Sequence, residues 1–405
     1  MGETQVEPID ALPSMCSMSV EPFRAEEQWQ RMEPLELKLL VRTKVVVNMI
    51  VSNKPHHLTS ESAGSKPRIL YLTKYSRLQA SSRYRVFNWA KLLRDMGFST
   101  DVLNLITEKR KKQKFNFYRQ ILQFIWRYDV IVLHKIIPSW TLRIILNSCK
   151  YLFNTIIILE FDDRIYSDKD LLNHYSQFKK TLSQCSKIIV SVEEMQKEIG
   201  THHPRLTNKI EVLPTLIDLL AYPQHQSRSE NRPFTIGWIG SSSGLQYLEQ
   251  IEPYLRSFLK DKEGKAELVV VCDLPFKPGF NDYPVRNVRW ELDKELDYFF
   301  MLEASLMPLD NSPRARCKAG FKAIQSLAAG TPVIASAVGF NKEVIAHGKN
   351  GYLAEKPSDF ERYLEELYSM QDRSAMSQAC KESAARFDYK AWIERYLEIV
   401  LNSQS

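Results

Sequence analysis

The sequence predicts an α/β protein that contains two successive parallel sheets. Short apolar runs of strand length alternate with helical stretches along most of the 405 residues, which is the pattern of repeated βαβ units. The alternation stops once, in a segment rich in proline and polar residues at 214–233, and then restarts. Hydrophobic residues make up 44% of the chain and charged residues 25%, which excludes a wholly disordered, collagen-like or coiled-coil protein.

The residues before the first sheet, at 1–66, are predicted to be a poorly ordered extension. Hydrophobic periodicity is weak before residue 33, and a single helix is expected at 33–50. Residues 53–67 are rich in Ser, His, Pro and Gly, a composition typical of a linker.

A first Rossmann-like domain is predicted at 67–225. Its first strand, at 69–72, is followed by a polar loop and a helix at 84–96, which Gly97 would end as a C-cap glycine. Further strands are expected at 102–106, 130–133, 156–160, 188–191 and 211–213.

A second Rossmann-like domain is predicted at 226–386. Its strands are expected at 235–239, 268–272, 288–290, 305–308, 332–336 and 351–353, and three helices at 358–369, 372–386 and 389–401 close the chain. Two such domains would face each other across an interdomain cleft. Ligands of open parallel sheets bind beyond the carboxyl ends of the strands, so we expect the functional residues in loops that follow strands.

The loop after the first strand is a candidate anion site. It contains Ser82, Arg83 and Arg85 just before a predicted helix, whose N-terminus favours negative charge. We expect these residues to bind a phosphate or the acceptor. The alternative is a helix cap flanked by exposed arginines.

The loop that opens the second domain, at 237–244, is rich in glycine and serine. Gly240 and Ser241 lie between a predicted strand and the following helix, where backbone N–H groups can bind a diphosphate. The segment matches neither the dinucleotide-binding fingerprint nor the P-loop, and a plain tight turn would look the same.

The densest group of cations precedes and opens the predicted helix before residue 330. It comprises Arg314, Arg316, Lys318 and Lys322. Positive charge is unfavourable near a helix N-terminus, and a bound anion would remove that conflict. Lys318 and Lys322 are four residues apart, so we expect one helical face to present both to a donor diphosphate.

Two neighbouring carboxylates follow an apolar strand. Asp162 and Asp163 could orient sugar hydroxyls, act as a base or hold a metal. The alternative is that they cap the next helix and pair with Arg164. We expect at least one of them to face the cleft as a catalytic residue.

Positive charge is concentrated in one part of the chain. Residues 66–160 contain 18 Lys and Arg against 5 Asp and Glu. Within them, the basic run Lys109–Lys114 precedes an aromatic, amphipathic stretch, a pattern that fits docking on an anionic membrane surface. The alternative is that the apolar residues pack on the sheet and the lysines are solvated. No nucleic-acid-binding module is recognisable, so nucleic acid is not expected as a partner.

The sequence also predicts where the protein works. It has no run of about 18 apolar residues, and its N-terminus is acidic where a secretory signal would be basic. The six cysteines are far apart and form no CxxC, which gives no support to a disulfide framework or a zinc site. We expect a cytoplasmic protein, with peripheral attachment at the inner face of a membrane.

Residues 67–400 resemble the group 1 glycosyltransferases of the GT-B fold. The most specific tract runs through 318–322, 330–336, 338–343 and 348–353, and a branch of this family has Asp-Asp at the strand end and Gly-Trp-Ile-Gly-Ser at 237–241. The resemblance implies that the second domain binds a nucleotide-sugar donor and the first binds the acceptor. It also implies that the last segment, 387–405, crosses back to the first domain. The donor residues that it implies are Gly240, Ser241, Arg314, Lys318, Gly320, Lys322, Gln325 and Glu343.

The donor helix departs from the family pattern at two positions. Most members have two spaced glutamates where this chain has Cys317 and Gln325. An amide can still bond a ribose hydroxyl, but a thiol cannot replace a carboxylate. The resemblance implies transfer of a sugar, with retention, to a glycan or lipid-linked acceptor in cell-surface polysaccharide synthesis, without a metal or cofactor. The alternative function is a catalytically inactive protein that binds nucleotide sugars or phosphoglycans.

Overall fold

The computed structural model describes residues 66–104, 121, 124–173, 175–222 and 232–401. All of them belong to the compact unit that begins at Pro55. The expected extension at 1–66, apart from Lys66, and the basic run Lys109–Lys114 lie outside the described residues.

The first of the two predicted parallel sheets has six strands in the order β2-β1-β3-β4-β5-β6. Strands β1, β3 and β4 are buried along almost their whole length, which explains their continuous apolar sequences. The strands are β1 Arg68–Thr73, β2 Ser99–Asn104, β3 Val130–His134, β4 Ile156–Phe161, β5 Lys187–Val190 and β6 Ile210–Val212.

Helices connect these strands. The helices of this half are α4 Ala80–Ser82, α5 Asn88–Asp95, α7 Trp140–Phe153, α8 Asp168–Leu172, α9 Gln177–Gln184 and α10 Glu193–His202. The short 3-10 turns are η3 Ile125–Arg127, η4 Pro204–Lys209 and η5 Leu219–Ala221. The predicted helix at 84–96 differs from the observed one, which begins at Ala80 and contains a π-helical segment, η2 Arg83–Phe87.

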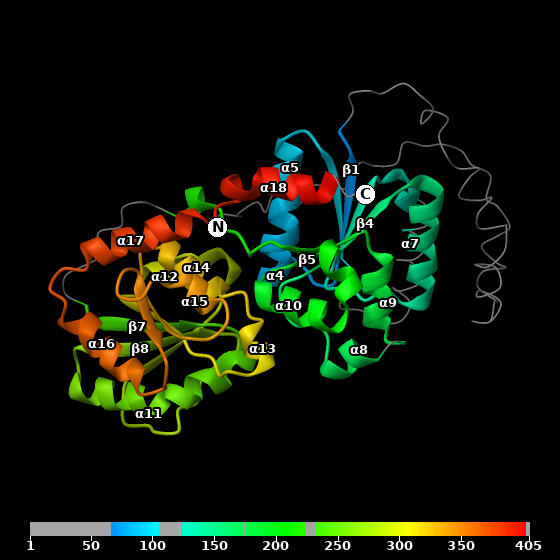
Figure 1. The fold of residues 1–405 in the computed structure, drawn as a ribbon. Helices are drawn as coiled ribbons and strands as arrows, with labels where there is room; N and C mark the ends of the chain where they lie inside the picture. Colours follow the sequence, from blue (N-terminus) through cyan, green and yellow to red (C-terminus); the bar gives the residue numbers. More distant parts are fainter. Residues whose placement is uncertain (1–65, 105–120, 122–123, 174, 223–231, 402–405) are drawn as a thin grey trace, which may run out of the picture. The chain divides into compact units, whose positions relative to one another are not determined.

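The second sheet also has six parallel strands, in the order β12-β11-β10-β7-β8-β9. Its strands are β7 Phe234–Ile239, β8 Ala266–Cys272, β9 Val285–Arg289, β10 Ala304–Met307, β11 Val333–Ser336 and β12 Gly351–Ala354. Its helices are α11 Leu245–Asp261, α12 Asp297–Phe300, α13 Pro313–Arg316, α14 Phe321–Ala328, α15 Asn341–Val344, α16 Asp359–Ser369 and α17 Ser374–Ala385, with the 3-10 turns η6 Ser242–Gly244 and η7 Leu292–Lys294. Helices α11 and α16 pack together, as do α14 and α17 (Figure 1).

The last helix, α18 Tyr389–Leu401, contacts the half of the molecule that contains the first sheet. The ring of Tyr396 stacks on Trp89 of α5 at 3.8 Å, and its hydroxyl lies 2.6 Å from that of Tyr71 in β1. Arg395 pairs with Glu211 of β6 at 2.6 Å. The final helix therefore covers apolar surface of the first sheet and its helices.

The strand orders define where ligands are expected. In the first sheet the chain runs from β1 to the neighbouring edge strand β2 and returns to continue from β3, and in the second it runs from β7 to the edge strand β9 and returns to continue from β10. The two switch points lie between β1 and β3 and between β7 and β10. Loops diverge at such points and leave space beyond the carboxyl ends of the strands.

Candidate functional site

A polar network lies at the first switch point, where β3 and β4 end. Lys135 follows β3 with a left-handed backbone (φ 55°), and its N–H donates to the carbonyl of Glu160 at 2.8 Å. Left-handed backbone is unfavourable for a residue with a Cβ atom and is found mostly where the surrounding structure holds it in place. The turn directs the Lys135 side chain to the carboxylates that follow β4.

Lys135 joins the two carboxylates that the sequence identified. Its Nζ lies 2.6 Å from Asp162 Oδ1 and 2.7 Å from Asp163 Oδ2. Asp162 is buried, whereas the side chain of Asp163 is 58% exposed. Arg164 pairs with Glu198 and Asp168, so the alternative in which Asp162 or Asp163 pairs with Arg164 is not what the structure shows.

Ser81 and His134 complete this network. The Ser81 hydroxyl donates to Asp162 Oδ1 at 2.7 Å, and His134 Nε2 lies 3.0 Å from the same hydroxyl. Because a hydroxyl has one proton to donate, Nε2 of His134 carries the ring proton and donates it to Ser81. The other ring nitrogen, Nδ1, is buried and has no hydrogen-bond partner among the residues that the structure describes.

Burial and charge fix the protonation states. Complete burial lowers the pKa of His134 to about 3, so the imidazole is neutral at neutral pH. Burial alone would raise the pKa of Asp162, but Lys135, His134 and Arg85 outweigh it and hold that pKa below its ordinary value. Burial would likewise lower the pKa of Lys135, yet the two carboxylates raise it above the ordinary range. The network therefore presents charged carboxylates beside a charged amine.

The loop after β7 at the second switch point is shaped by packing. A Cβ atom on Gly240 would lie 2.5 Å from the ring of Trp238, which explains the glycine without a ligand. The Ser241 hydroxyl lies 3.0 Å from that of Ser243. Asp273 accepts from the backbone N–H of Ser242 at 2.7 Å, so a protein carboxylate already occupies one of the donors expected for a diphosphate.

The loop after β10 contains the predicted cations, but they do not share one helical face. Helix α13 ends at Arg316, and α14 begins after Gly320, whose backbone is left-handed (φ 57°). Lys318 therefore precedes the helix that contains Lys322, and the expected pairing on one face is wrong. Arg316 turns to the first half of the molecule and pairs with Glu194 of α10 at 3.0 Å.

Lys318 links the two switch points electrostatically. Burial lowers its pKa, and Asp163 and Lys135 act on it in opposite directions, as do Asp310 and Arg314. Its Nζ lies 5.6 Å from the ring centre of Tyr247. Within the described part of the chain, the side chain of Lys318 forms neither an ion pair nor a hydrogen bond, whereas its backbone N–H donates to the carbonyl of Ala315 at 3.1 Å. A half-buried cation therefore lies within electrostatic reach of both sets of loops.

Lys322 was expected to bind a donor diphosphate, but in the structure its anionic partner is a carboxylate of the protein, that of Glu295. Glu295 accepts from Arg83 at 2.7 and 2.8 Å and from the Tyr84 hydroxyl at 3.0 Å, and it lies 3.6 Å from Lys322. Gln325 is fully buried, accepts from Lys322 at 2.9 Å and donates to Tyr84 at 3.1 Å. In this structure Lys322, Gln325 and Arg83 hold the two halves together and are not presented to a donor or acceptor.

Ser82 and Arg85 also form contacts within the protein and not with solvent. Ser82 is buried and bonds Thr73 at 2.9 Å. Arg85 is buried, pairs with Glu160 at 2.9 Å and donates to Thr215 at 3.1 Å. Neither the expected phosphate contact nor the alternative of exposed arginines agrees with this burial.

The remaining predicted donor residue, Glu343, lies on the short helix α15. Its electrostatic neighbours are Glu193, Lys197 and Arg386, and partial burial and Glu193 raise its pKa. Cys317 is buried, and its thiol contacts Glu198 Oε2 at 3.7 Å. The described residues contain no group of three or more His, Cys, Asp or Glu arranged to hold a metal ion.

Sequence reasoning missed His134 and Lys135, which belong to the network around Asp162, whereas Ser81 stands in the loop after the first strand that it selected as a candidate site. A signal was present, because His134 and Lys135 are polar and directly follow a predicted apolar strand. The adjacency of β1 and β3, which makes that loop a switch point, is a property of strand order. Glu295 carried no comparable signal, since its partners lie far away in the sequence.

Known proteins resemble this chain in part of its sequence and in its fold. Residues 315–387 match the family model described as glycosyl transferases group 1. The structure of a glycosyltransferase from Rickettsia africae covers 84% of this chain and 100% of its own, with 15% identity and a TM-score of 0.63. WaaG, a glycosyltransferase involved in lipopolysaccharide biosynthesis, covers 82% of this chain and 99% of its own, with 14% identity and a TM-score of 0.60.

A third similar structure contains ligands. Anabaena Alr3699/HepE in complex with UDP and glucose covers 82% of this chain and 99% of its own, with 14% identity and a TM-score of 0.59. A search of curated protein sequences finds no match. These likenesses identify the fold as GT-B and confirm the resemblance to group 1 glycosyltransferases. Among the described helices, none has the length and apolar character needed to cross a bilayer.

Proposed function

We propose that this GT-B protein, whose residues 315–387 form a group 1 glycosyl transferase region, transfers a sugar from a nucleotide sugar to a glycan or lipid-linked acceptor. One observation carries the proposal. Lys318, at one switch point, lies within electrostatic reach of Asp163 and Lys135 at the other. A reacting sugar needs fixed cations on one side and oriented carboxylates on the other, which is the distribution found here.

The donor is proposed to bind at the second sheet. Cleavage of the bond to a nucleoside diphosphate leaves negative charge on the departing phosphate, and fixed cations stabilise that charge in the transition state. Lys318 is half-buried and Arg314 lies beside it, so both are suited to this role. The similar structure of Anabaena Alr3699/HepE with UDP and glucose supports a nucleotide sugar as the donor class.

The first sheet is proposed to orient the sugar or the acceptor. Lys135 holds both carboxylates, and the pKa of Asp162 is lowered, so its oxygens accept hydrogen bonds from hydroxyls. Asp163 is exposed and faces the electrostatic field of Lys318. We assign Asp162 and Asp163 to contacts with sugar hydroxyls. We also propose a retaining outcome and no metal requirement, so chelation with EDTA should leave transfer unchanged.

The acceptor is proposed to be glycan or lipid-linked. Large apolar side chains are exposed on the first half of the molecule, among them Leu78, Trp140, Leu172 and Tyr175. Exposed apolar residues in a protein that also has a basic run favour contact with an anionic membrane. Peripheral attachment at the cytoplasmic face, through Lys109–Lys114, stays a prediction. Anionic vesicles should co-sediment the protein at low salt, and charge reversal in that run should abolish binding.

The second candidate is an inactive protein that binds nucleotide sugars or phosphoglycans. It is favoured by Cys317 and Gln325, which replace the usual glutamates and are both buried. The two functions differ in one measurement. The protein would be incubated with a panel of nucleotide sugars, with and without candidate acceptors. Mass spectrometry of the products would detect transfer of the sugar to an acceptor or, with water in its place, hydrolysis. Saturable binding without any released nucleoside diphosphate would favour the inactive protein.

The donor site is tested by Lys318→Ala. We expect nucleoside diphosphate affinity to fall by about 1.5–3 kcal/mol, the size of a hydrogen bond to a charged group. Lys342→Ala, at an exposed lysine of α15, is the matched control and should bind normally. Equal affinity in the Lys318 variant and the wild type would contradict the proposed donor site.

A further inference from the structure

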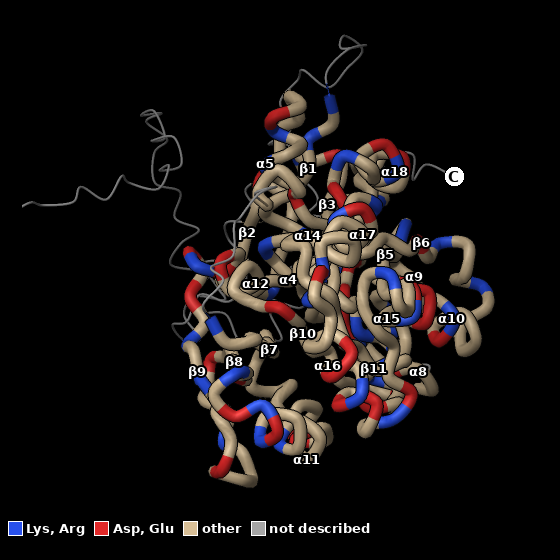
Figure 2. Tube along the Cα trace, turned by 90° about the vertical axis from the view of Figure 1, so that its left-hand side faces the viewer, with Lys and Arg blue, Asp and Glu red and all other residues tan. Residues whose placement is uncertain are grey.

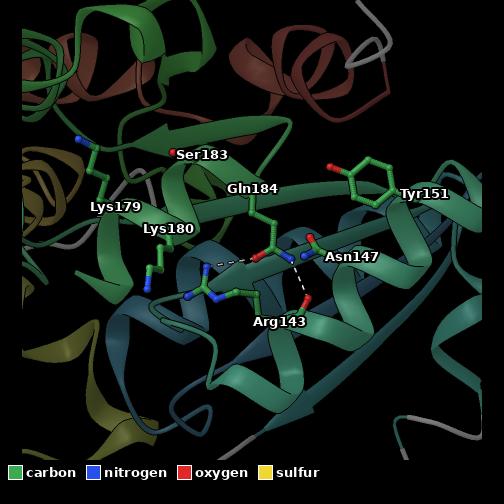
Figure 3. Close-up of a pocket in the computed structure, with 7 residues that line it drawn as sticks. All are labelled: Arg143, Asn147, Tyr151, Lys179, Lys180, Ser183 and Gln184. Carbon is green, nitrogen blue, oxygen red and sulfur yellow. Dashed lines mark hydrogen bonds between the residues drawn. The ribbon is translucent and has the colours of Figure 1, made fainter. Parts of the chain in front are cut away.

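A separate groove lies between α7 and α9, on the half of the molecule that contains the first sheet. Its volume is about 310 Å³. It shares no residue with the two switch points. The residues that line it are Arg143, Asn147, Tyr151, Lys179, Lys180, Ser183 and Gln184 (Figure 3).

Hydrogen bonds fix the floor of this groove. Arg143 donates to Gln177 Oε1 at 3.0 Å and to Thr181 Oγ1 at 3.2 Å. Gln184 donates to the carbonyl of Arg143 at 3.1 Å (Figure 3). Lys150 donates to the carbonyl of Gln184 at 2.7 Å. The two helices are therefore tied together, and a ligand would meet a preformed surface.

Arg143 and Lys180 give the groove positive charge that no carboxylate pairs with among the described residues. Every acceptor of Arg143 is a neutral carbonyl, amide or hydroxyl, and burial lowers its pKa. Among the described residues, Arg143, Lys150 and Lys180 form no ion pair with a carboxylate. Helices α7 and α9 contain four Lys and Arg and no Asp or Glu. Helix α11, in contrast, carries both signs of charge (Figure 2).

We propose that this groove binds a phosphorylated sugar residue. Lysine is suited to a phosphate, since it offers a mobile ammonium, and Arg143, whose donors are already bonded to the protein, adds fixed positive charge beside it. The ring of Tyr151 is 76% exposed at one end of the groove and offers an apolar face to a sugar ring. Asn147 and Ser183 offer polar groups for hydroxyls, and the volume is near the lower limit of about 300 Å³ for ligand sites.

The position of the groove suggests how a bound phosphosugar could contribute to the proposed transfer reaction. Helix α7 begins at Trp140, five residues after Lys135, so the loop of the first switch point leads into a helix that lines the groove. A glycan with a phosphorylated residue could be held there while another of its sugars lies at the switch point. That use rests on the proposed function, whereas binding of the phosphosugar does not.

The test is calorimetric titration of the full-length protein with glucose 6-phosphate, glucose, inorganic phosphate and phosphatidylglycerol vesicles. We expect glucose 6-phosphate to bind at least tenfold more tightly than phosphate or glucose. Lys180→Glu should weaken that binding at least tenfold, and Tyr151→Ala should weaken it while leaving phosphate binding unchanged. Lys277→Glu, at an exposed lysine of the other half, is the matched control.

Three results would overturn the proposal. Equal affinity for phosphate and glucose 6-phosphate would indicate a general anion site. Binding to vesicles alone, lost in Lys180→Glu, would assign the groove to lipid headgroups. Loss of glucose 6-phosphate binding in Lys318→Ala but not in Lys180→Glu would place the ligand at the switch points. Retained binding in Lys318→Ala separates this groove from the proposed donor site, so either proposal can fail alone.

Discussion

The side chains around Asp162 show how burial sets the chemistry of single residues. His134 and Lys135 are neighbours in sequence, yet one is neutral and the other is fully charged. The difference arises because two carboxylates face Lys135, whereas the imidazole of His134 is enclosed and contacts only a hydroxyl. The unpartnered Nδ1 of His134 can accept one further hydrogen bond.

The buried imidazole predicts acid sensitivity. The pKa of His134 is about 3 in the folded protein, against an ordinary value of 6.5. Between these values the unfolded chain binds the proton and the folded one does not, so stability is full above the ordinary pKa and is lost as pH falls. His134→Gln removes this contribution. Between about pH 7 and pH 5 the variant should lose about 2 kcal/mol less unfolding free energy than the wild type.

Urea denaturation at the two pH values measures this difference. Glutamine keeps a donor toward Ser81, so the variant should still fold. His202→Gln, at an exposed histidine, is the control and should change with pH as the wild type does. If the His134 variant also followed the wild-type pH dependence, the imidazole would have to be protonated in the folded state or accessible to water.

The sequence identified some residues of the network around Asp162 and missed others, because local sequence does not determine which strands lie side by side. Asp162, Asp163 and Lys318 stand in conspicuous loops, so charge and position relative to a strand were enough to select them. Lys135 is a single lysine in the segment with the most lysines. Its importance follows from the pairing of β3 with β1 and β4, which local sequence does not determine.

At the scale of elements, the start of α14 depends on one glycine. Gly320 adopts a left-handed backbone (φ 57°) before Phe321, and a Cβ atom there would lie 3.3 Å from the ring of Phe340. Gly320→Ala should lower the unfolding free energy by about 1–3 kcal/mol, because it adds backbone strain and a tight contact. Thermal and urea unfolding measure the loss.

Gly264→Ala separates the two causes. Gly264 also has a left-handed backbone (φ 73°), but a Cβ atom there would have no neighbour within 4 Å. This variant should show the cost of backbone strain alone and lose less stability than Gly320→Ala. Equal losses would mean that the contact with Phe340 contributes nothing.

Strands were predicted better than helix details, and the helix after β1 shows why. The predicted strands overlap all twelve observed ones. The apolar runs are most continuous in β1, β3 and β4, because strands buried on both faces must be apolar, whereas β2 and β9 are largely exposed or half-buried. The π-helical segment Arg83–Phe87 was not expected, since it depends on distant partners. Its first residues bond Glu295 and its third bonds Glu160, and neither partner is near in sequence.

At the scale of the whole molecule, α18 connects the end of the chain to the first sheet. Tyr396 is fully buried, stacks on Trp89 and bonds the Tyr71 hydroxyl. Tyr396→Ala should cost about 3–5 kcal/mol of unfolding free energy, as for other large aromatic residues in cores. Tyr396→Phe, which keeps the ring, should cost only about 1 kcal/mol.

The readout for these variants is unfolding followed by hydrogen exchange in β1 and α5. Exchange there should accelerate in Tyr396→Ala. Tyr175→Ala, at a tyrosine that is 80% exposed, should leave it unchanged. Faster exchange confined to β7–β12 would mean that α18 stabilises the second sheet instead.

The last prediction concerns the buried cluster around Glu295 that joins the two halves of the molecule. It depends on how many charged partners each member of the cluster would lose in a variant. Glu295 pairs with Arg83 and Lys322 and accepts a hydrogen bond from the Tyr84 hydroxyl. Burial would raise its pKa, but the charges of Lys322 and Arg83 outweigh burial and keep that pKa below the ordinary value. Glu295→Ala would leave two cations buried without an anion, whereas Arg83→Ala would leave Glu295 with two partners. Removing one member of a buried pair costs about 3–5 kcal/mol.

Glu295→Ala should therefore reach that range and exceed Arg83→Ala, although arginine has the larger side chain. Asp282→Ala, in the exposed cluster with Arg256, is the control and should cost far less than either, because water screens an exposed ion pair. Chemical denaturation at low and high salt measures all three variants. The Glu295 loss should persist at high salt, because water and ions do not reach a buried pair, and the Asp282 loss should disappear. If Arg83→Ala cost more than Glu295→Ala, packing of the arginine against Trp290 would govern the contact between the halves, and charge would be secondary.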